Sequence, residues 1–194
     1  MANVKVIYGS STGNTESAAA VIAGAFGTEA INITNAKPED FEAGLLILGS
    51  STWGLGELQD DWATGIAMLD GIDLTGRKVA VFGLGDQSGF GDTFVDAMGI
   101  LADKAKERGA VLVGETSAEG YAHTASSAEK DGKFCGLALD DNNEPDKTAD
   151  RISQWVDLLK QVSALFKADR EPGTAENVPG PARRFFHFGK EHHE

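Results

Sequence analysis

The pattern that most constrains this chain of 194 residues is an alternation of apolar runs with helical stretches. The run at residues 44–50, Gly-Leu-Leu-Ile-Leu-Gly-Ser, is continuously apolar, which is typical of a strand covered on both faces. The expected strands span residues 4–8, 29–33, 44–50 and 77–83, with a fifth beginning at 110–113, and the expected helices span 15–26, 60–69, 92–108 and 146–167. The alternation predicts an α/β fold, a doubly wound five-stranded parallel sheet with helices on both faces.

The turn after the first strand, GSSTGNTE at residues 9–16, has the composition of an anion site. The first N–H groups of a helix lack intrahelical partners and carry partial positive charge. Hydroxyl donors come from Ser10, Ser11, Thr12 and Thr15, while Gly13 lets the backbone approach a ligand. The turn lacks the Lys of G-x-x-x-x-G-K-[ST] and the glycines of G-x-G-x-x-G, so we expect a single phosphomonoester. An ordinary capped helix is the alternative.

Three loops rich in Gly, Thr and aromatic residues follow the first, third and fourth expected strands, at residues 9–15, 50–59 and 83–93. Ligands of doubly wound sheets bind beyond the carboxyl ends of the strands, where the strand order reverses. The three loops are therefore expected at one edge of the sheet. Their agreement favours a phosphate site over a simple helix cap.

Charge and cysteine content narrow the possible partners. The chain has 30 acidic and 17 basic residues, a net charge of −13, which excludes nucleic acid and anionic membranes and favours basic proteins. No apolar run approaches the roughly 20 residues of a membrane helix, and the N-terminus lacks a signal-peptide layout. The only cysteine, Cys135, excludes an internal disulfide and most cysteine-based metal sites. We expect a cytoplasmic monomer without a metal.

Four segments, in this order and spacing, resemble the long-chain branch of the flavodoxin family. They are GSSTGNTE at 9–16, STWGLGELQDDW at 51–62, GLGDQSGFGDTFVDAMG at 83–99 and DGKFCGLALDDNN at 131–143. The resemblance covers residues 1–168 and implies a flavodoxin-like domain with strand order 2-1-3-4-5. It also implies a long-chain insertion at 114–136 that splits the fifth strand. Residues 169–194 extend beyond the family's usual end, and we expect them to be flexible or folded back.

The resemblance implies FMN as the cofactor and assigns its parts. The phosphate would lie on residues 10–15, and the two faces of the isoalloxazine ring on the loops after the third and fourth strands. Phe90 stands where long-chain members usually have Tyr, so the aromatic face is kept and the hydroxyl is lost. The expected cofactor-binding residues are Ser10, Ser11, Thr12, Gly13, Asn14, Thr15, Ser51, Thr52, Trp53, Gly54, Leu55, Gly83, Gly85, Asp86, Phe90 and Asp92.

The function that the resemblance implies is that of a low-potential one-electron carrier, not an enzyme, which shuttles electrons between a flavodoxin reductase and acceptor redox enzymes. Aromatic walls and an acidic domain disfavour negative charge on the reduced flavin, which makes its second reduction step strongly reducing. The resemblance further implies that the Gly54–Leu55 peptide turns its carbonyl toward flavin N5–H on one-electron reduction. Basic-surfaced partners would dock near the flavin edge through Glu57, Asp60 and Asp61.

Two other functions stay open at this point. An FMN-dependent NAD(P)H:quinone oxidoreductase of similar fold would need an open flavin face, whereas Trp53 and Phe90 are expected to close both faces. A flavin-free regulatory domain would leave the aromatic loops without a purpose. Single residues also have simpler interpretations: Trp62 packs under the second helix, Asp92 caps the third helix, and His123 is a solvated residue in a peripheral insertion.

Overall fold

A parallel sheet forms the centre of residues 3–168, the part of the chain that the computed structural model describes. Its main path has the order β10-β5-β3-β1-β2, and β6 pairs with β5 ahead of β10, so β6 and β10 are two halves of one fifth strand. The strands are β1 (Val4–Tyr8), β2 (Ala30–Asn32), β3 (Leu45–Trp53), β5 (Lys78–Leu84), β6 (Val111–Leu112) and β10 (Leu137–Leu139). The predicted five-strand order and the split fifth strand are confirmed.

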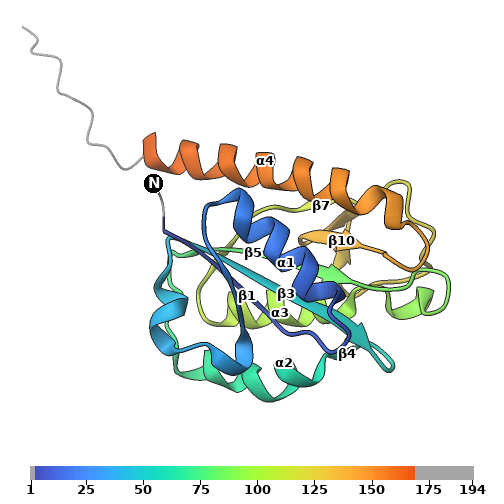
Figure 1. Ribbon diagram of the computed structural model, residues 1–194, viewed down its shortest axis with the longest axis horizontal. Coiled ribbons are helices and arrows are strands. Elements are labelled where there is room, and N and C mark those ends of the chain that lie inside the picture. Colours follow the sequence, from blue (N-terminus) through green and yellow to red (C-terminus); the bar gives the residue numbers. More distant parts are fainter. Residues whose placement is uncertain (1–2, 169–194) are drawn as a thin grey trace, which may run out of the picture.

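In the described part of the chain, residues 3–168, four α-helices cover the two faces of this sheet. They are α1 (Asn14–Ala25), α2 (Asp60–Gly65), α3 (Asp96–Glu107) and α4 (Thr148–Ala168). In Figure 1, α1 and α4 lie on one side of the sheet and α2 and α3 on the other. No helix within residues 3–168 is both long enough and apolar enough to cross a membrane.

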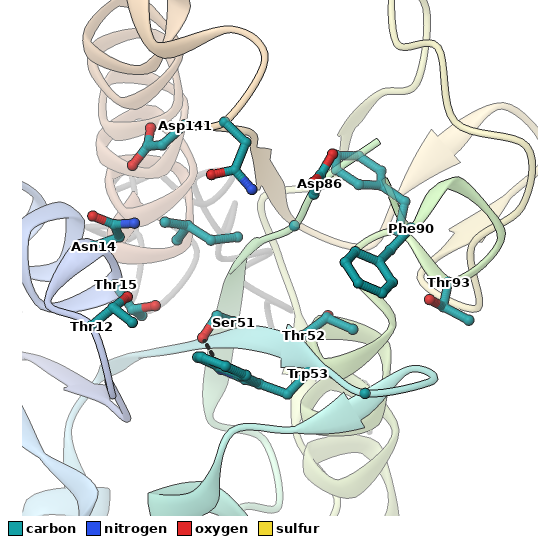
Figure 2. A pocket seen from close by; sticks show the side chains of 15 residues that line it. Thr12, Asn14, Thr15, Ser51, Thr52, Trp53, Asp86, Phe90, Thr93 and Asp141 are labelled. Carbon is teal, nitrogen blue, oxygen red and sulfur yellow. Dashed lines mark hydrogen bonds between the residues drawn. The ribbon is translucent and has the colours of Figure 1, made fainter. Parts of the chain in front are cut away.

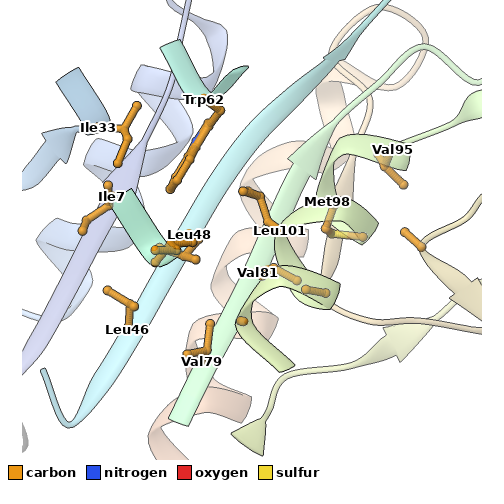
Figure 3. Packing of buried hydrophobic residues seen from close by; sticks show 14 of the residues in the cluster. Ile7, Ile33, Leu46, Leu48, Trp62, Val79, Val81, Val95, Met98 and Leu101 are labelled. Atoms are coloured by element: carbon orange, nitrogen blue, oxygen red, sulfur yellow. The ribbon is translucent and has the colours of Figure 1, made fainter. Parts of the chain in front are cut away.

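The core is divided by the sheet because successive side chains of a strand point to opposite faces. Leu46 and Leu48 of β3 pack in the cluster that contains Met98 of α3 (Figure 3), whereas Leu45 and Ile47 belong to the cluster with α1 and α4. Both faces of β3 are therefore buried, which explains its continuous apolar run.

Trp62 anchors α2 to the sheet. Its ring is fully buried, and its Nε1–H donates to the carbonyl of Gly49 at 2.7 Å. The expectation that Trp62 packs under the second helix is confirmed. This contact holds α2, and the loop that leads into it, next to the end of β1.

β3 runs three residues past its expected end at Ser50 and turns back through β4 (Glu57–Leu58) as an antiparallel hairpin. The turn contains Gly54 and Gly56 at φ of +53° and +96°, a region that glycine enters at little cost. The hairpin therefore lifts residues 53–56 beyond the edge of the sheet.

The third helix begins at Asp96 and not at Asp92, so the prediction that Asp92 caps it is wrong. Residues 91–93 form a separate 3-10 turn, and Val95, at φ of +50°, breaks the chain direction before α3. A side chain of β3 caps the first turn of α3: Ala97 N–H donates to Thr52 Oγ1 at 3.0 Å. Residues 90–95 are thereby left to form a loop.

The insertion is a packed structure, and the expectation of a peripheral loop is wrong. It contains a three-stranded antiparallel sheet made of β7 (Thr116–Ser117), β8 (Glu129–Lys130) and β9 (Lys133–Phe134). His123 is not solvated: its side chain is 7% exposed, pairs with Glu129 and packs on Phe94 and Phe134. Apolar contact with these aromatic rings draws the imidazole inward. The expected extension at 169–194 lies outside the described residues.

Candidate functional site

A pocket of about 400 Å³ lies beyond the carboxyl ends of the parallel strands. Figure 2 shows it between the first turn of α1, the end of β3 and the loop after β5. The residues that line it are Thr12, Asn14, Thr15, Ser51, Thr52, Trp53, Gly54, Leu84, Gly85, Asp86, Phe90, Thr93, Phe94, Asp141 and Asn142. They lie at or just beyond the carboxyl ends of β1, β3, β5 and β10.

At one end of the pocket, the first turn of α1 presents free backbone donors. The residue before the helix, Gly13, has φ of +93°, and no side chain caps the helix. Ser10 Oγ accepts from Gly13 N–H at 3.1 Å, which closes the turn, and the side chain of Thr15 is buried. Uncapped N–H groups at a helix start bind anions. Because no side chain occupies them, this geometry favours the phosphate site over the simple cap.

At the other end, two aromatic side chains are exposed. Trp53, at the end of β3, is 44% exposed, and Phe90, in the loop after β5, is 57% exposed. Trp53 is held by its Nε1–H, which donates to Ser51 Oγ at 2.9 Å. Large apolar rings that line a pocket while remaining open to solvent indicate a flat aromatic ligand.

Asp86 shapes the loop that carries Phe90. Its Oδ1 accepts from the N–H groups of Ser88 and Gly89 at 3.1 and 2.7 Å and from Asn143 Nδ2 at 2.8 Å. These donors, with Gly89 N–H the strongest, lower the pKa of the Asp86 carboxyl. The carboxylate therefore stays ionised beside the pocket and keeps the loop in a tight turn.

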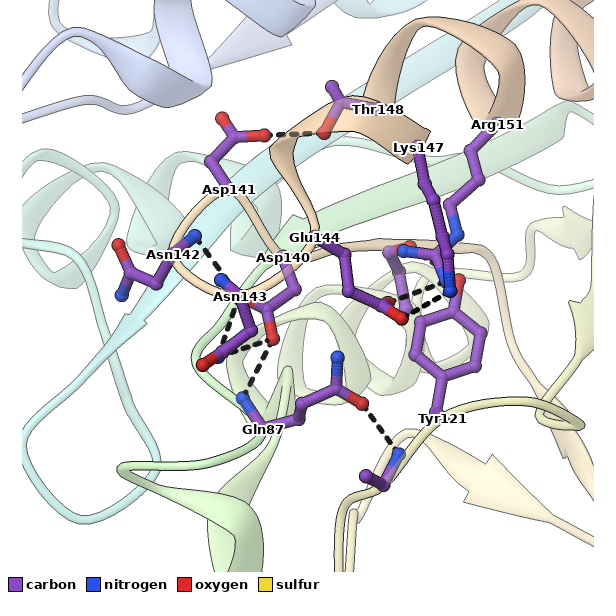
Figure 4. Close-up of polar contacts among 12 residues, drawn as sticks. Gln87, Tyr121, Asp140, Asp141, Asn142, Asn143, Glu144, Lys147, Thr148 and Arg151 are labelled. Carbon is purple, nitrogen blue, oxygen red and sulfur yellow. Dashed lines mark hydrogen bonds and ion pairs between the residues drawn. The ribbon is translucent and has the colours of Figure 1, made fainter.

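A fourth loop, after β10, completes the site, and sequence reasoning assigned it no role. Its centre is Asp140, which is fully buried and accepts from the N–H groups of Gln87, Asn142 and Asn143 at 3.1, 3.1 and 3.0 Å (Figure 4). The next residues, Asp141 and Asn142, line the pocket. The signal that could have found them is positional, because this loop follows the second half of the fifth strand and so ends at the same edge.

The structure brings ten of the sixteen expected cofactor residues to the wall of the pocket. These are Thr12, Asn14, Thr15, Ser51, Thr52, Trp53, Gly54, Gly85, Asp86 and Phe90. Among the other six, Ser10, Ser11 and Gly13 build the turn before α1. Gly83 lies inside β5 against Met98. Leu55, at the hairpin tip, and Asp92 are exposed and do not line the pocket. The pocket residues without an expected role are Leu84, Thr93, Phe94, Asp141 and Asn142.

The described part of the chain offers no cluster of metal ligands at the pocket, and its cysteine lies elsewhere. Within residues 3–168, no three His, Cys, Asp or Glu side chains gather in a way that could hold a metal ion. Cys135 is half-buried and lines a different cavity, next to Leu112 and Lys106. Burial raises the pKa of its thiol to about 11, so it is a poor nucleophile at neutral pH.

Comparison with known proteins gives one consistent result. A sequence model of the flavodoxin family matches residues 6–155. The chain is 46% identical to a flavodoxin of Trichodesmium erythraeum over 166 residues, which cover 82% of this chain and 97% of the relative. It is 43% identical to a flavodoxin of Picosynechococcus over 170 residues, 85% of this chain and 100% of the relative.

Solved structures agree with the sequence comparison. The structure of a Fusobacterium nucleatum flavodoxin bound to flavin mononucleotide is similar with a TM-score of 0.79 at 32% identity, covering 84% of this chain and 99% of the other. With the family match, the relatives and the fold in agreement, this chain belongs to the flavodoxin family.

Proposed function

We propose that the pocket binds FMN and that the protein carries electrons one at a time between other redox proteins. The observation that carries this proposal is the pairing of features in one pocket. Uncapped helix donors lie at one end, and two solvent-exposed aromatic rings lie at the other. A flavin mononucleotide has a phosphate and a flat ring in the same order. When bound, FMN supplies one-electron redox chemistry.

The residues of this chain bind the two parts of the ligand by different means. The N–H groups of the first turn of α1 and the hydroxyls of Thr12 and Thr15 hold the phosphate through hydrogen bonds, without a cationic side chain. Trp53 and Phe90 cover the ring and exclude water from it. The contact that the usual Tyr hydroxyl would make at position 90 is absent.

Acidic groups near the ring end set its electrostatics. Asp86 lines the pocket in the loop that bears Phe90, and the buried carboxylate of Asp140 accepts from the N–H of the next residue, Gln87. Negative charge held at this end raises the free energy of any further negative charge on the ring. The protein therefore makes the bound cofactor a strong reductant in its most reduced form.

The hairpin at residues 53–56 supplies a movable backbone carbonyl. Gly54 has φ of +53°, and a Cβ at this position would clash with the carboxyl of Glu57. Glycine would let the Gly54–Leu55 peptide turn toward a bound flavin, so that the Gly54 carbonyl would be an acceptor for a ring N–H.

The partners are a reductase that donates electrons and the redox enzymes that accept them. Glu57 and Asp60 are exposed beside the hairpin and offer negative charge to partners with basic surfaces. Asp61 adds charge but is also bonded internally, since its Oδ2 accepts from Ser10 N–H and Asn32 Nδ2. The protein acts as a cytoplasmic monomer, a location that the single cysteine favours.

Stopped-flow mixing of the FMN-loaded protein with NADPH tests this function against that of a quinone oxidoreductase. An electron carrier is reduced slowly by NADPH alone and much faster when a separate flavodoxin reductase is added. Rapid direct reduction by NADPH, followed by transfer to a quinone, would contradict the proposal. Reduction by dithionite serves as the control that the bound flavin is redox-active.

A further inference from the structure

Buried polar side chains are concentrated at the pocket. Within residues 3–168, the buried residues of polar or charged type are Thr15, Ser50, Gln59, Gln87 and Asp140. All five lie at the carboxyl edge of the sheet, in or next to the loops that form the site. Gln59 and Gln87 are 1% and 5% exposed. A buried amide is costly unless its hydrogen bonds are made, so the partners of these two residues show what they hold in place.

Gln59 joins the loop after β4 to the turn before α1. Its Nε2 donates to Ser11 Oγ at 2.9 Å, and its Oε1 accepts from Asp61 N–H at 3.0 Å. The turn packs directly on this amide, because a Cβ at Gly9 would clash with Gln59. Since Gln59 uses a lone pair of Ser11, the hydroxyl hydrogen of Ser11 stays free to donate to a ligand. Ser11 also precedes Thr12, which lines the pocket.

Gln87 joins three segments at the opposite end of the pocket. Its backbone N–H donates to Asp140 Oδ2 at 3.1 Å, and its Oε1 accepts from Ala122 N–H at 2.6 Å (Figure 4). Its side chain is also among the groups that lower the pKa of the Glu144 carboxyl. Gln87 therefore fixes the loop that bears Asp86 and Phe90 against both the insertion and the segment after β10.

We infer that Gln59 and Gln87 are positioning residues for the two ends of the cofactor: Gln59 for the phosphate and Gln87 for the ring. Neither side chain lines the pocket, so each acts through the loop that it holds. The inference rests on the proposed function and extends it. It gives the insertion a role, because the bond from Ala122 makes the insertion a support for the ring-binding loop.

The test compares two ligands on matched variants. Riboflavin has the ring and side chain of FMN without the phosphate. Gln59→Met and Gln87→Met remove the same buried amide at the two ends, so each variant is the control for the other. The loss of about one to two hydrogen bonds corresponds to roughly tenfold in affinity. Affinities for FMN and riboflavin are measured by titration of each apoprotein, and folding is checked by circular dichroism.

We expect Gln59→Met to lower the affinity for FMN about tenfold and to leave the affinity for riboflavin within about twofold of the wild-type value. We expect Gln87→Met to weaken both ligands by the same factor and to change the visible absorption spectrum of the bound flavin, which Gln59→Met leaves as in the wild type. In a Ser11→Ala background, Gln59→Met should have little additional effect on FMN. A purely structural role would produce neither the ligand pattern nor this coupling.

Two outcomes would overturn the inference. One is a Gln59→Met protein that loses FMN and riboflavin equally, and the other is a Gln87→Met protein that retains wild-type affinity for riboflavin. If a Met variant does not fold, Gln59→Glu repeats the test at the phosphate end, because it loses the donor to Ser11. At the ring end Gln87→Lys repeats it, because it keeps a donor and loses the acceptor that Ala122 N–H uses. A wild-type protein that binds no FMN would defeat the proposed function itself, whereas binding without the expected pattern would defeat only this inference.

Discussion

The two ends of the pocket are built in opposite ways. The end proposed to bind the phosphate, called the phosphate end, consists of consecutive residues 10–15 between β1 and the first turn of α1. The end with Trp53 and Phe90 is called the ring end. The rest of the pocket wall, which includes the ring end, is assembled from residues 51–54, 84–94 and 141–142. These segments meet only when β3, β5 and β10 are paired in register. The difference teaches that the anion site is a local property of the chain, whereas the ring site is a property of the whole sheet.

The ends also differ in charge. The phosphate end has no cationic side chain on the pocket wall and offers backbone dipoles and hydroxyls. The ring end is acidic, with Asp86 on its wall and the buried Asp140 bonded to the next residue, Gln87. An anionic ligand with a neutral ring can therefore bind in one orientation only, with its phosphate at α1.

Removing the phosphate from the ligand should have the largest effect. Wild-type protein should bind riboflavin at least about a hundredfold more weakly than FMN, because two or more charge-assisted hydrogen bonds of about 1.5 kcal/mol each are lost. Quenching of flavin fluorescence during titration measures both affinities. Equal affinities would show that the phosphate does not occupy the helix start, and would break the contrast between the ends.

Trp53→Ala should lower the affinity for FMN about thirtyfold, or about 2 kcal/mol of binding free energy, because a ring-stacking surface is lost. The affinity for riboflavin should fall by the same factor, since Trp53 lies at the ring end. Trp53→Phe keeps an aromatic face and should recover most of the affinity for both ligands. A variant that loses FMN alone would mean that Trp53 serves the phosphate, contrary to the assignment of the two ends.

Asp140→Asn should lower the free energy of unfolding of the apoprotein by about 1–2 kcal/mol. The amide accepts less strongly and turns donors toward the N–H groups of Gln87, Asn142 and Asn143. Urea unfolding measures the change, and Asp92→Asn, on an exposed carboxyl, should stay within about 0.5 kcal/mol of wild type. Equal effects of the two substitutions would show that the hydrogen bonds accepted by Asp140 do not stabilise this end of the pocket.

The ring end should also respond to acid. Lys147 and then Arg151 donate to Glu144 and lower its pKa from 4.5 to about 2. A lowered pKa in the folded state gives stability that is complete above pH 4.5 and is lost as the pH falls toward about 2. At neutral pH the free energy of unfolding of the wild type should exceed that of Glu144→Gln by about 1 kcal/mol. The difference is this small because solvent screens the two ion pairs. Urea unfolding at several pH values should show this difference shrinking below pH 4.5; a constant difference would contradict the pairing.

Leu55→Ala should have the smallest effect on the cofactor. Leu55 is 87% exposed at the hairpin tip and does not line the pocket, although it lies two residues from Trp53. Affinity for FMN should remain within about twofold of wild type, in keeping with a surface substitution. A loss comparable to that of Trp53→Ala would mean that the hairpin closes over the ligand and that the ring end extends to its tip.

Local patterns predicted the strand, turn and helix at the α1 end of the pocket well, and the loops at the other end in part. The strand, turn and helix around Gly13 follow from apolar pattern and turn composition, which act over a few residues. The start of α3 was missed because Thr52, far away in the sequence, bonds its first turn. Asp140 was missed because its role depends on Gln87 and Asn143, and His123 because its burial depends on Phe94. These contacts form only after the sheet has assembled.

A crystal structure of the protein loaded with FMN tests the two-ended site most directly. The phosphate should lie within hydrogen-bonding distance of the N–H groups at the start of α1, and the ring should contact Trp53 and Phe90. The Gln59 and Gln87 amides should keep the bonds that they make to Ser11 and Ala122. A phosphate bound elsewhere, or a ring that lies outside the two aromatic side chains, would contradict the two-ended site.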